Sequence, residues 1–123
     1  MVVAMAKKPV KRMTLTVKDV SPGGIKGQLI VTATGRKQQV MFDVVADLIQ
    51  FKPGDKIKIE LYPDEPPSNL DKYEFCGHGY LVSKPGDPYT IFSIWGILFK
   101  FEPPIEIEPN RKYYLCITGS EKE

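Results

Sequence analysis

The sequence predicts an all-β domain, a sandwich or a small barrel, and three observations favour that fold class. Short runs of alternating polar and apolar residues recur along the chain, Gly and Pro stand at the joints between them, and no segment carries a sustained helical period. The length of 123 residues fits one domain, and a hydrophobic share of 42% is ordinary for a globular protein. We therefore expect one core enclosed by strands.

Four alternating runs separated by turns make up the first half of the predicted domain. The runs are residues 13–20, 24–33, 38–49 and 56–62, and the turns are SPGG at 21–24, TGRK at 34–37 and KPGD at 52–55. The third run places Val40, Phe42 and Val44 on one face. Its end, DVVADLIQF, also fits one or two helical turns, but the β-branched residues favour a strand. The fourth run directs Ile57, Ile59 and Leu61 inward and Lys56, Lys58 and Glu60 outward.

The second half continues the same pattern. We expect strands over 73–82, over an alternating run at 88–95 that continues into FSIWGILFKF at 92–101, and over 112–118. Two connections, PDEPPSNLD at 63–71 and PPIEIEPNR at 103–111, are rich in Pro and are expected to be extended. KPGD occurs again at 84–87. Because the residues after the two copies do not match, both are interpreted as turns and not as an internal repeat.

The charge and the cysteine count restrict the class of protein. The 17 basic and 15 acidic residues give a net charge of +2, which is low for a dedicated duplex-DNA binder. The basic residues Lys7, Lys8, Lys11 and Arg12 predict a solvated N-terminal tail, or else an arm that touches nucleic acid or an acidic partner. Two cysteines are too few for a disulfide framework, and no apolar run is long enough to span a membrane or serve as a secretory signal. We expect a soluble, cytoplasmic protein with reduced cysteines.

The stretch FCGHGY at 75–80 is the strongest candidate for a chemical site. On a strand, Cys76 and His78 share one face, and Cys116 joins them if the last strand lies alongside. Three such ligands fall short of the four of a structural zinc site, and neighbours two apart on a strand are too far apart for a nucleophile and its base. The glycines indicate a bulge, a bend or a close backbone approach. We predict no metal, no cofactor and no catalytic residue, with a metal-dependent enzyme as a remote alternative.

The segment 92–101 suggests a binding surface. Interpreted as one strand, it is apolar on both faces, with Trp95, Ile97, Phe99 and Phe101 on one and Phe92, Ile94, Gly96 and Leu98 on the other. A barrel has one inside, so the second face is covered either by the terminal segments or loop 63–71, or by another protein. The residues predicted for a partner interface are Phe92, Ile94, Trp95, Gly96, Ile97 and Leu98. Stacking of bases on tyrosines near lysines is the competing hypothesis, and its residues are Tyr62, Tyr73, Tyr113, Tyr114, Lys72 and Lys112.

Taken in order, six stretches resemble one family, the small subunit 8 of archaeal and eukaryotic multisubunit RNA polymerases. They are VKDVSPGG, VMFDVVADL, PGDKIKIEL, YEFCGHGYLV, IWGILFKF and KYYLCI, and they span residues 13 to 118. Two features depart from the pattern: Ile97 stands at the family's second signature glycine, and Cys76 and His78 replace apolar or aromatic residues. The compact loop 63–71 is similar to archaeal members.

The resemblance implies an antiparallel barrel of eight strands of the oligonucleotide-binding type over 13–118, with tails over 1–12 and 119–123. It also implies a non-catalytic accessory subunit of an archaeal DNA-directed RNA polymerase, docked on the largest subunit, with nucleic acid contacted at most through the complex. The alternative is a stand-alone barrel that binds single-stranded nucleic acid. Function still has to be argued from a site, since one fold serves many functions.

Overall fold

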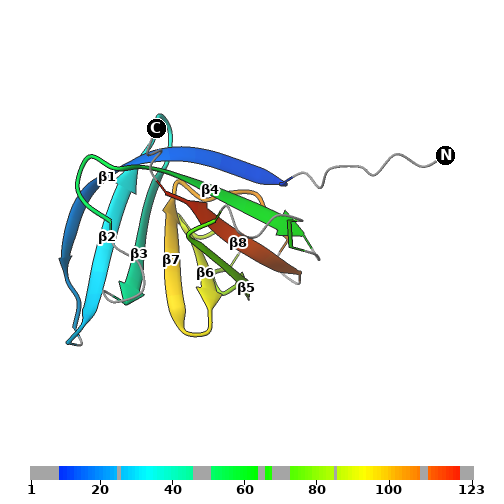
Figure 1. Cartoon of the computed structure of the whole chain (residues 1–123). Helices are drawn as coiled ribbons and strands as arrows, with labels where there is room; N and C mark the ends of the chain where they lie inside the picture. The colour runs from blue at the N-terminus through cyan, green and yellow to red at the C-terminus, as the bar shows by residue number, and fades with distance from the viewer. Residues whose placement is uncertain are drawn as a thin grey trace.

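Eight strands, each antiparallel to its neighbours, close into a barrel in the computed structural model of the chain (Figure 1). The structure describes residues 9–24, 26–45, 51–63, 66–67, 73–84, 86–108 and 111–119. The strands are β1 (Lys11–Pro22), β2 (Gln28–Thr34), β3 (Gln39–Val45), β4 (Lys56–Pro63), β5 (Phe75–Leu81), β6 (Thr90–Ile94), β7 (Ile97–Glu102) and β8 (Lys112–Thr118). Among these residues, no helix is long and apolar enough to cross a membrane. The predicted all-β barrel is confirmed.

The order of strands around the barrel is β1-β2-β3-β7-β6-β5-β8-β4, and β4 pairs with β1 to close it. The long strand β1 makes this closure, because its first half pairs with β4 and its second half with β2. The register shifts between Val17 and Asp19, where a bulge adds one residue. The extra residue shifts the alternation of inward and outward side chains by one position. Val17 is therefore buried, and Val20, three residues later, also packs against the core.

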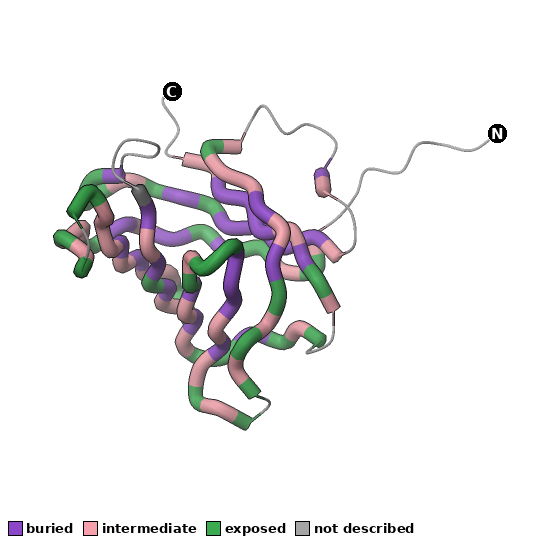
Figure 2. The backbone as a smooth tube through the Cα atoms, turned by 90° about the horizontal axis from the view of Figure 1, so that it is seen from below, coloured by how far each residue is buried: buried purple, intermediate pink, exposed green. Residues whose placement is uncertain are grey.

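The interior is filled by the inward residues of every strand, and buried and exposed positions alternate along the backbone (Figure 2). The largest fully buried side chains are Phe42, Phe92, Phe99, Phe101, Leu15, Ile57, Ile59, Leu61, Ile94, Leu115, Ile117 and Val17. Phe42 stacks on Phe99 at 5.0 Å between ring centroids. The inward faces predicted for β3 and β4 are therefore confirmed. Glu60 does point away from the core with Lys56 and Lys58, but it is buried, whereas both lysines are exposed.

The described residues of the two KPGD segments make the same hydrogen bonds. In each, the Asp side chain accepts a hydrogen bond from the Lys backbone N–H, at 2.9 Å for both Lys52–Asp55 and Lys84–Asp87. Gly54 and Gly86 have positive φ angles of 98° and 96°, which fits a Pro-Gly turn that needs glycine at its third residue. The first turn lies later than predicted. β1 continues to Pro22, Gly23 N–H donates to Gln28 O, and β2 begins at Gln28 instead of residue 24.

The glycines of β5 allow a close backbone approach, as the sequence indicated. A Cβ added to Gly77 would lie 2.6 Å from Ile94 Cγ2, and one added to Gly79 would overlap the carbonyl oxygen of Ser93. Both glycines face the core, where β6 leaves no room for a side chain. The strand's other face carries Cys76, which lies directly opposite Cys116 on β8 and is bonded to it. The prediction of two reduced cysteines is therefore wrong.

The segment 92–101 is not one strand but a hairpin. Ile94 pairs with Ile97, and Trp95 and Gly96 form the two-residue turn between β6 and β7. Their φ angles of 50° and 89° are both positive, as the tight hairpin turn of type I′ requires. The turn resets the alternation, so Phe92 and Ile94 face inward along with Phe99 and Phe101. The prediction of one strand apolar on both faces is wrong.

Several expectations lie wholly or partly outside the described residues. They are the N-terminal tail before residue 9, the helical alternative for residues 46–50, most of loop 63–71, and the tail after residue 119. Residues 103–108 belong to no strand or helix, and their extended conformation stays a prediction. Within them Ile105 is buried, and its backbone N–H donates to Thr90 Oγ1 at 3.0 Å.

Candidate functional site

The outer surface of β5, β6 and β7 carries a group of exposed apolar side chains, which we call the apolar face. Its members are Tyr80, Val82, Trp95 and Leu98, with exposed fractions of 53%, 51%, 79% and 45%. Met41, at 39%, extends the group onto the neighbouring strand β3. Exposed large apolar residues are ordinary when scattered singly, but a contiguous group on adjacent strands is typical of a protein-binding surface.

The strand register brings these side chains together. Tyr80 pairs with Ser93, and Ser93 pairs with Leu98, so these three outward residues form one row across β5, β6 and β7. In the next row, Val82 N–H donates to Ile91 O, and Ile91 pairs with Lys100, which in turn pairs with Met41. Directly opposite side chains in adjacent strands lie about 5 Å apart. The apolar face therefore spans β5, β6 and β7, with the buried Ser93 between Tyr80 and Leu98, and Lys100 separates it from Met41 on β3.

Trp95 is the most exposed member, and its backbone conformation is costly. A left-handed conformation costs an L-residue roughly 1–2 kcal/mol, and glycine, asparagine and aspartate are the usual residues at this turn position. Trp95 adopts it with φ 50° and remains 79% exposed, so neither turn preference nor burial explains the residue. The β6–β7 pairing on both sides holds the side chain at the hairpin tip. Nothing in the described part of the barrel therefore accounts for a tryptophan at this position.

A hollow of about 460 Å³ lies beside Trp95, between the hairpin and β5. Tyr80, Trp95 and Lys112 line it together with His78. His78 stacks on Tyr114, with ring centroids 4.2 Å apart and planes within 3°. Its buried Nε2 atom has no hydrogen-bond partner among the described residues. The hollow thus combines aromatic surface and a lysine, a mixture that suits a partner's side chain.

The six residues predicted for the interface divide into two sets. Trp95, Gly96 and Leu98 are exposed, and Ile97 is half-buried against the core. Phe92 and Ile94 are each 0% exposed and belong to the core, so they are removed from the predicted surface. Sequence reasoning missed Tyr80, Val82 and Met41. Their signal was the alternation of 76–82, which places Tyr80 and Val82 on the outer face with Cys76 and His78.

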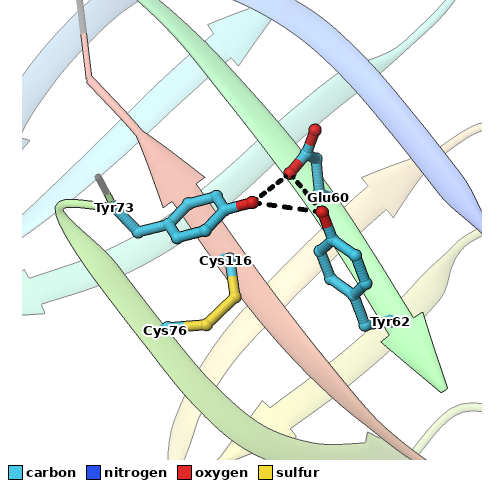
Figure 3. Close-up of a disulfide and its surroundings, with 5 residues drawn as sticks. All are labelled: Glu60, Tyr62, Tyr73, Cys76 and Cys116. Carbon is cyan, nitrogen blue, oxygen red and sulfur yellow. Dashed lines mark hydrogen bonds between the residues drawn. A yellow bond between two sulfur atoms is a disulfide. The ribbon is translucent and has the colours of Figure 1, made fainter. Parts of the chain in front are cut away.

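The predicted chemical stretch does not assemble a metal or catalytic site from its cysteines. Cys76 and Cys116 bond to each other (Figure 3), so neither offers a thiolate. His78 lies two residues further along β5. Among the described residues, no three His, Cys, Asp or Glu side chains converge as metal ligands would.

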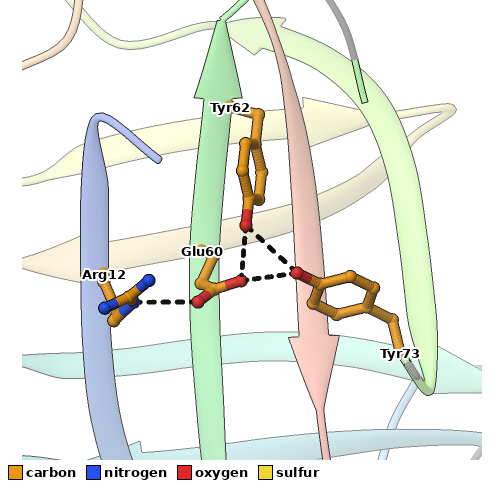
Figure 4. Close-up of polar contacts among 4 residues, drawn as sticks. All are labelled: Arg12, Glu60, Tyr62 and Tyr73. Atoms are coloured by element: carbon orange, nitrogen blue, oxygen red, sulfur yellow. Dashed lines mark hydrogen bonds and ion pairs between the residues drawn. The ribbon is translucent and has the colours of Figure 1, made fainter. Parts of the chain in front are cut away.

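Glu60 is the centre of a polar cluster on the outer surface of β1, β4 and β8 (Figure 4). Glu60 Oε1 accepts hydrogen bonds from Tyr73 at 2.7 Å and from Tyr62 at 2.9 Å. Glu60 Oε2 accepts one from Arg12 Nε at 2.9 Å, which is also an ion pair. The two tyrosine oxygens lie 3.1 Å apart. Each phenol has one proton to donate, and both tyrosines donate it to the ionised Glu60 carboxylate. The contact between the two tyrosine oxygens therefore has no proton of its own.

The electrostatics of this cluster keep Glu60 charged. Burial raises its pKa, but the hydrogen bonds from Tyr73, Tyr62 and Arg12 and the charge of Arg12 outweigh burial, so the pKa lies below its ordinary value. Burial, together with the hydrogen bond to Glu60, raises the pKa of Tyr62 and Tyr73. A carboxylate and two phenols held in these protonation states form a structural cluster and are poorly suited to proton transfer near neutral pH.

The tyrosines proposed as a stacking platform for bases are used elsewhere. Tyr62 and Tyr113 are 5% and 2% exposed, Tyr73 is bonded to Glu60, and Tyr114 is covered by the His78 ring. Tyr113 also accepts a hydrogen bond from the Glu108 backbone N–H at 2.8 Å. A platform needs open ring faces. The geometry therefore disfavours base stacking on these residues.

Two comparisons with known proteins agree with the resemblance seen in the sequence. The family model for RpbG, a subunit of DNA-directed RNA polymerase, matches residues 10–120, from β1 through β8. The chain is also similar to the DNA-directed RNA polymerase subunit Rpo8 of Saccharolobus solfataricus, with 27% identity over 96 residues that cover 72% of this chain and 71% of that protein. The chain therefore belongs to the RpbG family of DNA-directed RNA polymerase subunits.

Proposed function

We propose that the protein is a non-catalytic accessory subunit of an archaeal DNA-directed RNA polymerase and that it docks on the largest subunit through the apolar face. The observation that carries the proposal is Trp95, which is 79% exposed in a costly backbone conformation at the tip of a hairpin. Tryptophan and tyrosine are the residues that most often dominate protein–protein binding energy. The proposed role is to position and stabilise the largest subunit in the cytoplasm.

The non-catalytic character rests on what the polar side chains do. Glu60 accepts three hydrogen bonds, and its lowered pKa makes it a weak base. Cys76 and Cys116 are bonded to each other. A subunit whose reactive side chains stabilise its own barrel contributes surface to a complex, while the nucleotidyl transfer takes place on another chain.

Co-purification of the full chain with the largest polymerase subunit tests this proposal. We expect Trp95→Ala to weaken the complex by about 2 kcal/mol, roughly 30-fold in Kd, because the variant lacks the tryptophan side chain that docking would bury. Val82 and Val10 supply a matched pair, since they are 51% and 50% exposed but lie in different parts of the surface. Val82→Ser should weaken docking by about 1 kcal/mol and Val10→Ser by much less.

Equal loss of binding in the two valine variants would show that the apolar face is not the docking surface. Retention of wild-type affinity by Trp95→Ala would remove the hairpin tip from the interface. A tagged copy that recovers only nucleic acid from native extract, with no large polymerase subunit, would favour a stand-alone binding protein.

A further inference from the structure

The first half of β1 and the turn between β2 and β3 form a groove on a different part of the barrel from the apolar face. Four basic residues line it, Lys11, Arg12, Arg36 and Lys37, and none of the described residues lining it is acidic. Arg36 and Lys37 are exposed at the tip of the turn. So dense a group of cations stands out in a chain whose net charge is only +2.

The backbone holds the two cations of the turn beside β1. Gly35 N–H donates to Gln38 O at 2.7 Å, which closes the turn around Arg36 and Lys37. A Cβ added at Gly35 would lie 2.6 Å from the carbonyl oxygen of Thr14, so a residue with a side chain would push the turn away from β1. The groove is therefore a built feature of the fold and not a chance approach of two loops.

The positive surface continues from the groove onto β4. Thr14 pairs with Lys58 and Thr16 pairs with Lys56, and both lysines are exposed. Two acids of the described chain flank this surface. Glu102 pairs with Gln39, which pairs with the groove residue Thr34, and Glu60 is buried and holds Arg12 at 2.9 Å. The Arg12 side chain is nevertheless 58% exposed. A ligand in the groove would meet cations from three segments of chain. Of the two acids nearby, Glu60 is already hydrogen-bonded and Glu102 lies beyond the lining residues.

We infer that this groove binds the phosphate backbone of a nucleic-acid strand. Lysine and arginine with threonine hydroxyls are the side chains that contact phosphate oxygens, and Thr14, Thr16 and Thr34 line the groove with the cations. No aromatic residue is among its described lining, so binding does not depend on the bases. An acidic protein segment fits less well, because such partners also bury apolar anchors and the single large apolar residue there, Met13, is 9% exposed.

The groove and the apolar face lie on opposite sides of the barrel. In the ring of strands, β6 at the centre of the apolar face is as far from β1 as the order allows in either direction (Figure 1). A subunit docked through β5–β7 would thus leave the groove open. The inference does not rest on docking to the largest subunit, since each surface is tested by its own variants.

Fluorescence anisotropy of the full chain with labelled oligouridine and oligothymidine tests the inference. We expect both to bind with Kd of about 1–100 µM at moderate salt, as sequence-independent phosphate binding does. Arg36→Glu with Lys37→Glu should weaken both by about tenfold or more. The same double variant should make the plot of log K against log salt shallower by about 1.4, since each lost phosphate contact removes about 0.7.

The matched control is Lys26→Glu with Lys84→Glu, which changes the charge equally at two exposed positions in other turns. This control and Trp95→Ala should stay within about twofold of the wild type, because neither touches the groove. An equal loss of affinity in the lysine control would show that the effect comes from net charge and not from the groove. Loss of binding in Trp95→Ala would move the site to the aromatic hollow, and competition by oligoglutamate as strong as by RNA would make the ligand an acidic peptide. Each of these results overturns the inference.

Discussion

Two sides of the barrel are built by the same strand alternation but leave their outward side chains in opposite states. On the β1–β4–β8 side, Glu60 points outward yet is only 4% exposed, because Tyr62, Tyr73 and Arg12 surround and bond it. On the β5–β6–β7 side, Trp95 is 79% exposed and lies in an open hollow. A side chain that points outward from its strand is therefore not always exposed to solvent. A side whose polar groups hydrogen-bond to one another stabilises the barrel. A side that leaves apolar side chains exposed to solvent is where a partner is expected.

The disulfide joins β5 to β8, where the two sides meet, and its loss should give the largest effect on stability. Cys76 and Cys116 are 40 residues apart in sequence, and closing a loop of that length is worth about 4 kcal/mol. We expect dithiothreitol to lower the free energy of unfolding by about that amount in urea titrations. The double variant Cys76→Ala with Cys116→Ala is the control and should not respond to the reductant. An unchanged urea midpoint for reduced wild-type protein would show that the bond adds nothing.

Removal of the Glu60 carboxylate should give the second-largest loss of stability. Glu60→Ala takes away the acceptor of three hydrogen bonds and leaves the Tyr62 hydroxyl buried, which should cost about 2 kcal/mol. Glu106→Ala, at an exposed position of the extended connection, is the matched control and should change the unfolding free energy by less than about 0.5 kcal/mol. Similar losses of unfolding free energy in the two variants would show that the Glu60 cluster stabilises the barrel no more than an ordinary surface position does.

The same carboxylate should make stability depend on acid. Its pKa is lowered in the folded state from the ordinary 4.5, so its contribution is present above pH 4.5 and is lost as the pH falls through the folded value. The difference in unfolding free energy between the wild type and Glu60→Gln should therefore shrink below pH 4.5. Urea titrations at several pH values measure it, and a difference that stays constant from neutral to acid pH would contradict the assignment of Glu60 as the charged acceptor.

The exposed side should give the smallest effect on stability. Trp95→Asn replaces a residue that buries little with one that tolerates a positive φ, so we expect the free energy of unfolding to rise by about 0.5–1 kcal/mol. Calorimetry of the full chain measures it. A fall of more than about 1 kcal/mol would mean that Trp95 contributes to the barrel itself, and the contrast between the two sides would fail.

Sequence alternation was enough to place most strands and their inward faces, because period-two burial leaves a clear pattern in β3 and β4. It failed at Trp95 and Gly96, since a two-residue turn without polar residues is hidden inside an apolar run, and that turn decides the facing of every residue from 92 to 101. The Glu60 cluster was missed because its partners come from three segments. The Cys76–Cys116 bond depends on the β5–β8 register, which local sequence does not determine.

The most direct test of the account uses the chain's single tryptophan. Full-length protein labelled with 5-fluorotryptophan has one fluorine resonance, from Trp95, whose shift between H₂O and D₂O reports exposure to solvent. We predict a large solvent shift for the free chain and its loss when the unlabelled largest polymerase subunit is added. A complex that forms while the resonance keeps its solvent shift would place the docking surface elsewhere and contradict the central claim.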